Sequence, residues 1–297
     1  MNRIDLHLTT RRLVRLGALW ATLATLPLGC ATPPDTGGTA PAPSSDALPE
    51  GPTSTAIVSA QTARLAKLLP LHASGQVELR WVDEDGSHFE FCRGDLFAAA
   101  GPLVALDLRK AGERFLFLGC DAQRSWAFDL RAAPRRLDVW PHGTAAQREQ
   151  AAGVSALDLV DLTGLGPFRI ADGEPEYEPA SGQWTVKAEG LGGPIRVWVE
   201  RNWLVPVRID ALDEVGNTRL SSTLEEYRGI DRPGLPPGAL PRLPERVRIV
   251  APQRDTSVML SLATADPDGS AVAPGLFDLE RLVRILRPED VQGLEPR

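Results

Sequence analysis

An alternation of apolar and polar residues recurs in short runs along most of this chain, and it constrains the fold more than any other feature. Val77, Leu79 and Trp81, for example, alternate with two charged residues, and residues 83–86, Asp-Glu-Asp-Gly, then supply a turn. The runs are centred on residues 77–81, 89–92, 104–108, 115–118, 126–130, 184–186, 195–199, 205–209, 220–224, 247–249 and 258–262. They predict about eleven strands joined mostly by short turns, and so a mainly β protein with one large antiparallel sheet.

Two segments have helical rather than alternating spacing. Residues 55–69 carry apolar side chains at near-helical intervals and end at Pro70, and residues 144–164 also have helical character. A sheet of this size cannot stay flat, because neighbouring strands rotate by roughly 20–25°, so its apolar face becomes concave. These two helical segments could plug the concave face, but they are too short to fill it completely. We therefore expect a large curved antiparallel sheet, an unclosed β-barrel, that encloses an apolar cavity fit for hydrocarbon.

Several aromatic rings are expected on the apolar face of this sheet. Each ring taken singly is expected to fill the interior, because a sheet must first bury one of its faces. The arginines that alternate with the apolar residues, Arg80, Arg109 and Arg208, are expected on the solvated outer face. As a group, the inward residues form the candidate wall of the cavity: Trp81, Phe89, Phe91, Leu106, Leu108, Phe117, Trp126, Phe128, Val197, Val199, Val207 and Ile209.

Residues 1–29 have the order of a secretory signal that ends before a lipidation site. A basic segment at 11–15 precedes an apolar run from Leu16 to Leu28, and Gly29 precedes Cys30. The run is shorter than the roughly 20 apolar residues that a bilayer crossing requires. This end of the signal resembles the bacterial lipoprotein box, although Leu28 stands where a small residue is usual.

The lipoprotein box implies that the chain is cleaved before Cys30 and acylated there, which would anchor it to a membrane. Ala31 follows the cysteine, and by the enterobacterial sorting rule this implies the periplasmic face of the outer membrane. The alternative is an ordinary signal peptide with a chance cysteine. Residues 30–53 are rich in Pro, Gly, Ser and Thr, so they are expected to form a disordered tether that leads to one domain at 54–292.

The charge of the chain argues against a nucleic-acid partner. The formal net charge is −7, and removal of the signal with its net charge of +3 leaves −10. An acidic domain lacks the basic footprint that binds a phosphate backbone.

The arrangement of the strands resembles the LolA/LolB lipoprotein-localisation superfamily, in which an unclosed β-barrel with a helical lid carries acyl chains. The resemblance rests on the leading helix and on a core with the order apolar strand, Gly turn, strand and aromatic strand, and it covers most of residues 54–282. Its segments are 77–82, 89–93, 103–109, 115–118, 124–130, 195–199, 205–209 and 275–279. A lipid-anchored member is similar in layout to LolB. The Pro-rich segment 233–244 departs from the family, and Leu96-Phe97 is the nearest candidate for a protruding apolar loop, with packing under a turn as the alternative.

Residues that carry catalysis or bind metals form no recognisable pattern in the sequence. The histidines that remain after loss of the signal are scattered, and neither HExxH nor GxSxG is present. Two Asp-rich turns, at 83–86 and 266–269, lack the rest of a calcium-binding loop. We therefore expect no enzyme activity, no cofactor and no metal.

Two cysteines of the domain fall on strands that are not neighbours. If Cys92 lies on the second strand of the meander and Cys120 on the fourth, one strand separates them by about 9.5 Å. This exceeds the limit of roughly 7 Å between the Cα atoms of a disulfide. We predict two unpaired and mostly buried thiols.

Two functions of different class remain open. The first is a non-enzymatic lipoprotein that binds or accepts lipid or lipoprotein acyl chains in the cavity. The second is a structural or protein-interaction lipoprotein of the cell envelope with a filled core and an unknown protein partner. A hydrolase would need a histidine and a nucleophile that only folding brings together.

Overall fold

A computed structural model describes residues 51–83, 86–142, 154–170, 173–266 and 269–293. The described residues belong to one compact unit, Leu48–Arg297. The signal, Cys30 and most of the tether lie outside the described residues, so the three remain predictions.

The part of the chain that the structure describes contains fourteen strands, which form one sheet in the order β14-β6-β5-β4-β3-β2-β1-β13-β12-β11-β10-β9-β8-β7. Neighbouring strands are antiparallel except β14 and β6, which run parallel. The strands are β1 Leu71–Asp83, β2 Gly86–Ala98, β3 Val104–Lys110, β4 Glu113–Cys120, β5 Arg124–Asp129, β6 Arg136–Pro141, β7 Glu176–Glu178, β8 Gln183–Glu189, β9 Pro194–Val199, β10 Pro206–Leu212, β11 Thr218–Gly229, β12 Arg242–Ala251, β13 Thr256–Asp266 and β14 Asp290–Gln292.

The sheet consists of two meanders that meet at a central seam. Strands β1 to β6 follow one another to one side, and β7 to β13 return from the opposite edge until β13 lies beside β1. The prediction of a mainly β chain with one large sheet is confirmed. The predicted meander of five strands is present and continues into β6.

In the described residues three α-helices accompany the sheet: α1 Ser54–Leu68, α3 Ala156–Leu162 and α4 Leu279–Leu286. Two 3₁₀ turns, η1 Pro237–Ala239 and η2 Pro274–Leu276, lie in loops. Helix α1 begins where the Thr53 side chain accepts a hydrogen bond from the backbone N–H of Ala56. It ends one residue before Leu69, which precedes Pro70. No helix in the described ranges combines the length and the apolar character that a bilayer crossing requires.

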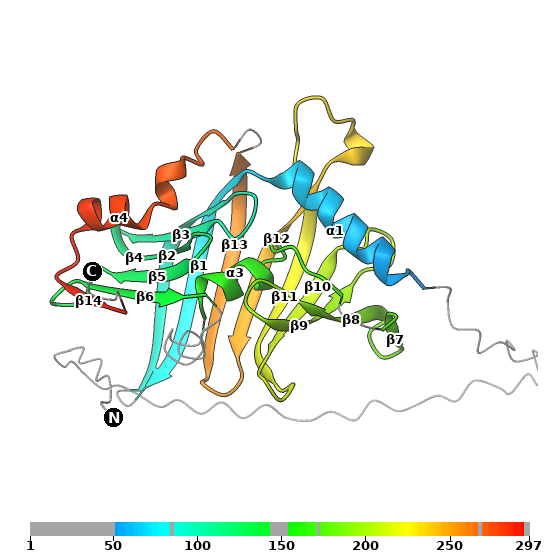
Figure 1. Cartoon of the computed structure of the whole chain (residues 1–297), viewed down its shortest axis with the longest axis horizontal. Helices are drawn as coiled ribbons and strands as arrows, with labels where there is room; N and C mark the ends of the chain where they lie inside the picture. The colour runs from blue at the N-terminus through cyan, green and yellow to red at the C-terminus, as the bar shows by residue number, and fades with distance from the viewer. Residues whose placement is uncertain (1–50, 84–85, 143–153, 171–172, 267–268, 294–297) are drawn as a thin grey trace, which may run out of the picture. The chain divides into compact units, whose positions relative to one another are not determined.

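The position of α3 shows that the sheet is bent. This helix contacts β3, β4 and β5 on one side and β10 on the other, although five strands separate β3 from β10 in the sheet order. The strands therefore curl around α3, while α1 packs across β12 (Figure 1). The sheet ends at the edge strands β14 and β7 and is not closed into a barrel. The predicted unclosed, curved sheet with a few covering helices is confirmed.

The sheet buries apolar side chains on both of its faces, which the sequence did not predict. The main core lies on the concave face, around α1 and α3. A second, smaller core lies on the outer face of β3 to β6 and is covered by α4, which contributes Leu279, Leu282 and Leu286.

Candidate functional site

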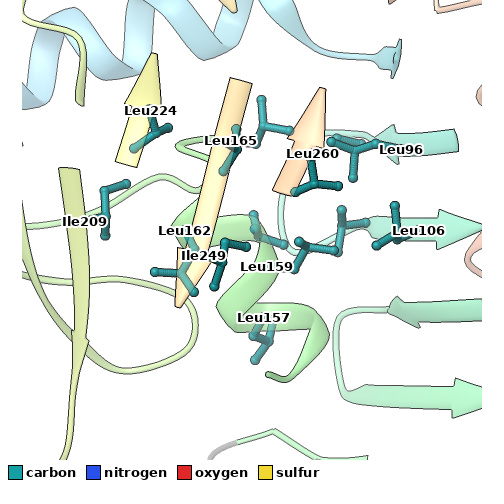
Figure 2. Close-up of a cluster of buried hydrophobic side chains, with 14 of the residues drawn as sticks. Leu96, Leu106, Leu157, Leu159, Leu162, Leu165, Ile209, Leu224, Ile249 and Leu260 are labelled. Atoms are coloured by element: carbon teal, nitrogen blue, oxygen red, sulfur yellow. The ribbon is translucent and has the colours of Figure 1, made fainter. Parts of the chain in front are cut away.

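The centre of the concave face is filled by α3. All seven residues of the helix are buried, and it is held between strands from both meanders. Figure 2 shows Leu157, Leu159, Leu162 and Leu165 pointing among the side chains of the surrounding sheet. Leu96, Leu106, Ile209, Leu224, Ile249 and Leu260 surround them. The interior that we expected to be open is thus occupied by side chains of the protein itself.

A helix of seven residues is too short to be stable without outside support, so its contacts hold it. Ser155 begins the helix with a capping box, in which its hydroxyl accepts from the backbone N–H of Asp158 at 3.1 Å. The Asp158 carboxylate in turn accepts from the Ser155 backbone N–H at 2.9 Å. The sequence Ser-Ala-Leu-Asp therefore specifies the start of α3 locally.

A buried ion pair attaches the start of α3 to the sheet. The guanidinium of Arg219, on β11, donates to both carboxylate oxygens of Asp158, one of them at 3.2 Å from Nη1. The side chains are 18% and 3% exposed, respectively, so water screens this pair only weakly. Both charges are needed once they are buried, because removal of either one leaves the other without compensation.

A second carboxylate attaches α3 to the loop between β8 and β9. Asp161 accepts from the backbone N–H groups of Leu191 at 3.0 Å and Gly192 at 2.7 Å. Burial raises its pKa to about 7, and the two backbone hydrogen bonds act in the opposite direction. A Cβ atom on Gly190 would lie 2.5 Å from the same carboxylate, so this close approach requires glycine. The group therefore changes charge close to neutral pH.

The end of α3 is attached to α1 by two buried polar side chains. Gln61 donates to the carbonyl oxygens of Gly164 at 3.1 Å and Gly166 at 2.8 Å. Arg64 also donates to Gly164 and to the carbonyl of Arg242 at 2.9 Å, and burial lowers its pKa. These contacts satisfy carbonyls that a helix end would otherwise leave unpaired. The two helices therefore form one internal unit.

The structure separates the twelve predicted wall residues into four groups. Five of them, Leu106, Leu108, Val197, Val199 and Ile209, are buried together in the concave core. Three others, Phe117, Trp126 and Phe128, are buried in the second core on the outer face. Trp81 and Val207 are half-buried, and Phe89 and Phe91 are exposed. The expectation that all twelve share one face is therefore wrong.

The register of the first hairpin explains why Phe89 and Phe91 are exposed. Cys92 pairs with Val77, and directly opposite residues share a face, so Cys92 points inward. Phe91 pairs instead with Glu78, and Phe89 with Arg80, on the solvated side. The side chains of β2 thus alternate between the two faces as predicted, but Phe89 and Phe91 lie on the outer face and not on the concave face that we expected.

The two cysteines agree with the prediction. Cys92 on β2 and Cys120 at the end of β4 are free and buried, with β3 between their strands. Burial raises the pKa of Cys92 to about 11 and that of Cys120 to about 12. Within the described residues no group of three or more His, Cys, Asp or Glu side chains is placed to hold a metal ion.

Sequence reasoning missed the polar side chains that hold α3. Asp158, Asp161 and Arg219 resemble solvated residues when they are considered singly. A signal was present in the first helix, where Gln61 and Arg64 lie on the same buried side as Ile57 and Leu65. Polar residues within an apolar helix face indicate buried hydrogen-bond partners.

The fold and its interior define a class of protein: an unclosed antiparallel sheet that curls around an internal helix. No protein-family model matches the chain, and no curated protein matches it. Solved structures do match. A DUF1329 family protein from Desulfovibrio piger aligns with a TM-score of 0.52 at 10% identity, over 77% of this chain and 98% of that chain.

A domain from Vibrio parahaemolyticus, provisionally assigned as an outer membrane lipoprotein-sorting protein, aligns with a TM-score of 0.52 at 11% identity, over 77% of this chain and 97% of that one. A LolA superfamily protein from Nitrosomonas europaea has 13% identity over 73% of this chain and 94% of its own, with a TM-score of 0.47. At these identities the likeness concerns the fold. The chain has the fold that its resemblance to lipoprotein-localisation proteins predicted.

Proposed function

We propose that this protein is a non-enzymatic lipoprotein of the bacterial envelope that binds or accepts lipid or lipoprotein acyl chains on the concave face of its sheet. One observation carries the proposal: the centre of the concave face is filled by a short helix, α3, whose apolar side chains pack in the core and which is attached to its surroundings by the polar contacts of Asp158 and Asp161. The similarity to a lipoprotein-sorting domain supports the same class of ligand.

Displacement of α3 is the step that would admit a ligand. Its apolar side chains contact the same leucines and isoleucines that a hydrocarbon chain would contact. Burial of each CH₂ group contributes about 0.8 kcal/mol to the free energy of binding. An acyl chain of about 14 carbons would therefore gain roughly 11 kcal/mol, which would offset the loss of the contacts that α3 makes with the sheet. The polar contacts of Asp158 and Asp161 then set how readily the exchange occurs.

Anchoring through Cys30 is the second part of this proposal. A flexible tether of about 24 residues has an end-to-end distance of roughly 25–30 Å, which would hold the domain close to the periplasmic face of the outer membrane. Replacement of Cys30 by Ser followed by membrane fractionation tests this part by itself. The variant is expected in the soluble fraction, and its retention in membranes would contradict lipid anchoring.

The filled interior also favours a second candidate function, that of a structural or interaction lipoprotein. In that case α3 would be a permanent part of the core, and the outer surface would bind a protein partner. The two candidates differ in one property, namely whether α3 leaves the concave face.

Native mass spectrometry of the protein purified from bacterial membranes tests acyl-chain binding directly. We expect co-purified lipid in addition to the lipid attached to Cys30, and fluorescence of the dye 1-N-phenylnaphthylamine when it is added to delipidated protein. Arg219→Leu weakens the attachment of α3 and should increase the dye signal, whereas Arg80→Leu, at an exposed arginine, should leave it unchanged. Absence of both lipid and dye binding would reject the first function and favour the second.

A further inference from the structure

The hairpin formed by β1 and β2 extends beyond its neighbours in the sheet. Pairing of β1 with β13 ends at Arg80, and pairing of β2 with β3 begins only at Arg93. Among the described residues, the segment Gly86–Cys92 of β2 therefore pairs with β1 on one side and has no strand on the other. Figure 1 shows this cyan hairpin running past the ends of β3 to β6.

In the described part of the chain this edge has no neighbouring strand, and an edge of this kind offers backbone groups to other chains. Proteins commonly block such edges with Pro, with Lys or with very short strands. The terminal strands of this sheet, β7 and β14, have three residues each. The segment Gly-Ser-His-Phe-Glu-Phe-Cys of β2 contains neither Pro nor Lys. Lys110 and Arg131 form ion pairs with the side chain of Glu90 and so flank this edge, while the backbone of the segment remains able to pair.

Two aromatic rings stand beside this edge on the outer face. Phe89 and Phe91 are 56% and 46% exposed, and they are two residues apart on one strand. The Arg80 guanidinium lies 5.1 Å from the centre of the Phe89 ring. An added strand would place alternate side chains against these rings, as in strand addition by peptides.

An open groove of about 1110 Å³ continues from the edge toward the body of the sheet. It is formed where the turn between β3 and β4 meets β1 and β2, and Phe91, Arg93, Arg109 and Lys110 are among its lining residues. The end of an extended segment paired with β2 would enter this groove. The edge and the groove therefore form one continuous site.

The groove presents positive charge, although the chain as a whole has a net charge of −7. The Arg93 side chain is 66% exposed, whereas its partner Asp95 is 11% exposed. The Arg109 side chain is 41% exposed, and the Asp107 carboxylate that it contacts is 2% exposed. The guanidinium groups are exposed to solvent while the carboxylates that pair with them are buried, so the surface of the groove is positively charged and favours an acidic ligand.

We propose that the edge Gly86–Cys92 of β2 binds an extended, acidic peptide segment of another protein by strand addition. Apolar residues of the segment pack on Phe89 and Phe91, and its carboxylates lie at Arg93 and Arg109. A membrane surface would use the rings and the cations but would leave the backbone edge unpaired, which is costly in lipid. This inference goes beyond the proposed function because it concerns the outer face and does not depend on the interior.

Fluorescence anisotropy with the full-length protein in detergent tests the proposal. The probe is a labelled synthetic peptide that alternates valine and threonine and ends in a run of glutamates, prepared in both chain directions. We expect saturable binding that weakens at least about tenfold when lysines replace the glutamates. N-methylation of alternate residues should abolish binding in one register and leave it intact in the other, because only every second N–H faces β2.

Matched variants distinguish binding at this site from non-specific binding to the protein surface. Phe89→Ser with Phe91→Ser, and Arg93→Glu, should each weaken peptide binding at least about tenfold. Trp203→Ser and Arg201→Glu, at an exposed turn of the other meander, should leave it unchanged. All of these positions are exposed, and thermal unfolding verifies that the variants fold.

Several results would overturn the proposal. They are absence of peptide binding, binding that is indifferent to the register of N-methylation, dimerisation of the protein through β2, and binding to anionic vesicles but not to peptides. Each differs from failure of acyl-chain binding, which is measured by co-purified lipid and is independent of Phe89 and Phe91.

Discussion

The ion pair between Asp158 and Arg219 allows a direct test of how α3 is held in the interior. In Arg219→Leu the carboxylate stays buried and keeps its two hydrogen bonds from Ser155, at 2.9 Å from the backbone and 2.8 Å from the hydroxyl. Removal of one partner of a buried pair costs roughly 3–5 kcal/mol. Because Arg219 is 18% exposed and Ser155 still stabilises the charge, we expect the lower end, about 3 kcal/mol.

Urea unfolding followed by tryptophan fluorescence measures this free energy, and thermal unfolding should show a Tm lowered by about 6–12 °C. Asp158→Asn and the double variant complete a cycle. We expect the double variant to be at least about 2 kcal/mol more stable than the sum of the single effects predicts, because neither charge is then left alone.

The control is Arg80→Leu, at an arginine that is 65% exposed and lies 3.6 Å from a half-exposed Glu78. Its effect should be within about 0.5 kcal/mol. If Arg219→Leu costs less than about 1 kcal/mol and the cycle is additive, the ion pair does not hold α3, and the reasoning about the interior is refuted.

Three further predictions concern the titrating groups and the two cores. The pKa of Asp161 is raised to about 7 in the folded state from its usual 3.8, so its contribution to the free energy of unfolding should decline by roughly 2–3 kcal/mol between pH 5 and pH 8. The wild type should therefore lose stability over this range relative to Asp161→Asn, and parallel pH profiles of the two proteins would contradict the raised pKa. Cys92 and Cys120, with raised pKa values, should resist iodoacetamide at pH 8 until the protein is unfolded, and peptide mapping that finds rapid labelling or a disulfide would contradict their burial. Phe128→Ala should destabilise the protein by roughly 3–5 kcal/mol and Phe89→Ala by less than about 1 kcal/mol in urea unfolding, and similar values would mean that the hairpin register is wrong.

The sequence determined the period of the sheet and the position of the first helix closely. The helix expected at 55–69 is Ser54–Leu68, and every predicted strand is present. The three strands that were missed, β6, β7 and β14, have between three and six residues. Runs this short contain too few alternations to be distinguished from loops.

The candidate site was only partly predictable, because the period of apolar residues along a strand does not determine which of the two faces of the sheet a side chain lies on. In β4 residues 115–118 are all apolar, and Phe117 is covered by α4 on the outer face while Leu116 and Leu118 pack against the concave core. The choice depends on where α4 docks, which is not a local property of β4. For the same reason the filling of the interior by α3 followed from tertiary contacts of Asp158 and Asp161 rather than from helix propensity.

The seam between β1 and β13 has a consequence for biosynthesis. Ser74 and Thr264, whose hydroxyls meet across this seam, are 190 residues apart in sequence. Closing so long a loop is slow, so the middle of the sheet forms late. If the chain is delivered from its amino terminus, β1 therefore has no partner strand on the β13 side until nearly the whole chain has been delivered.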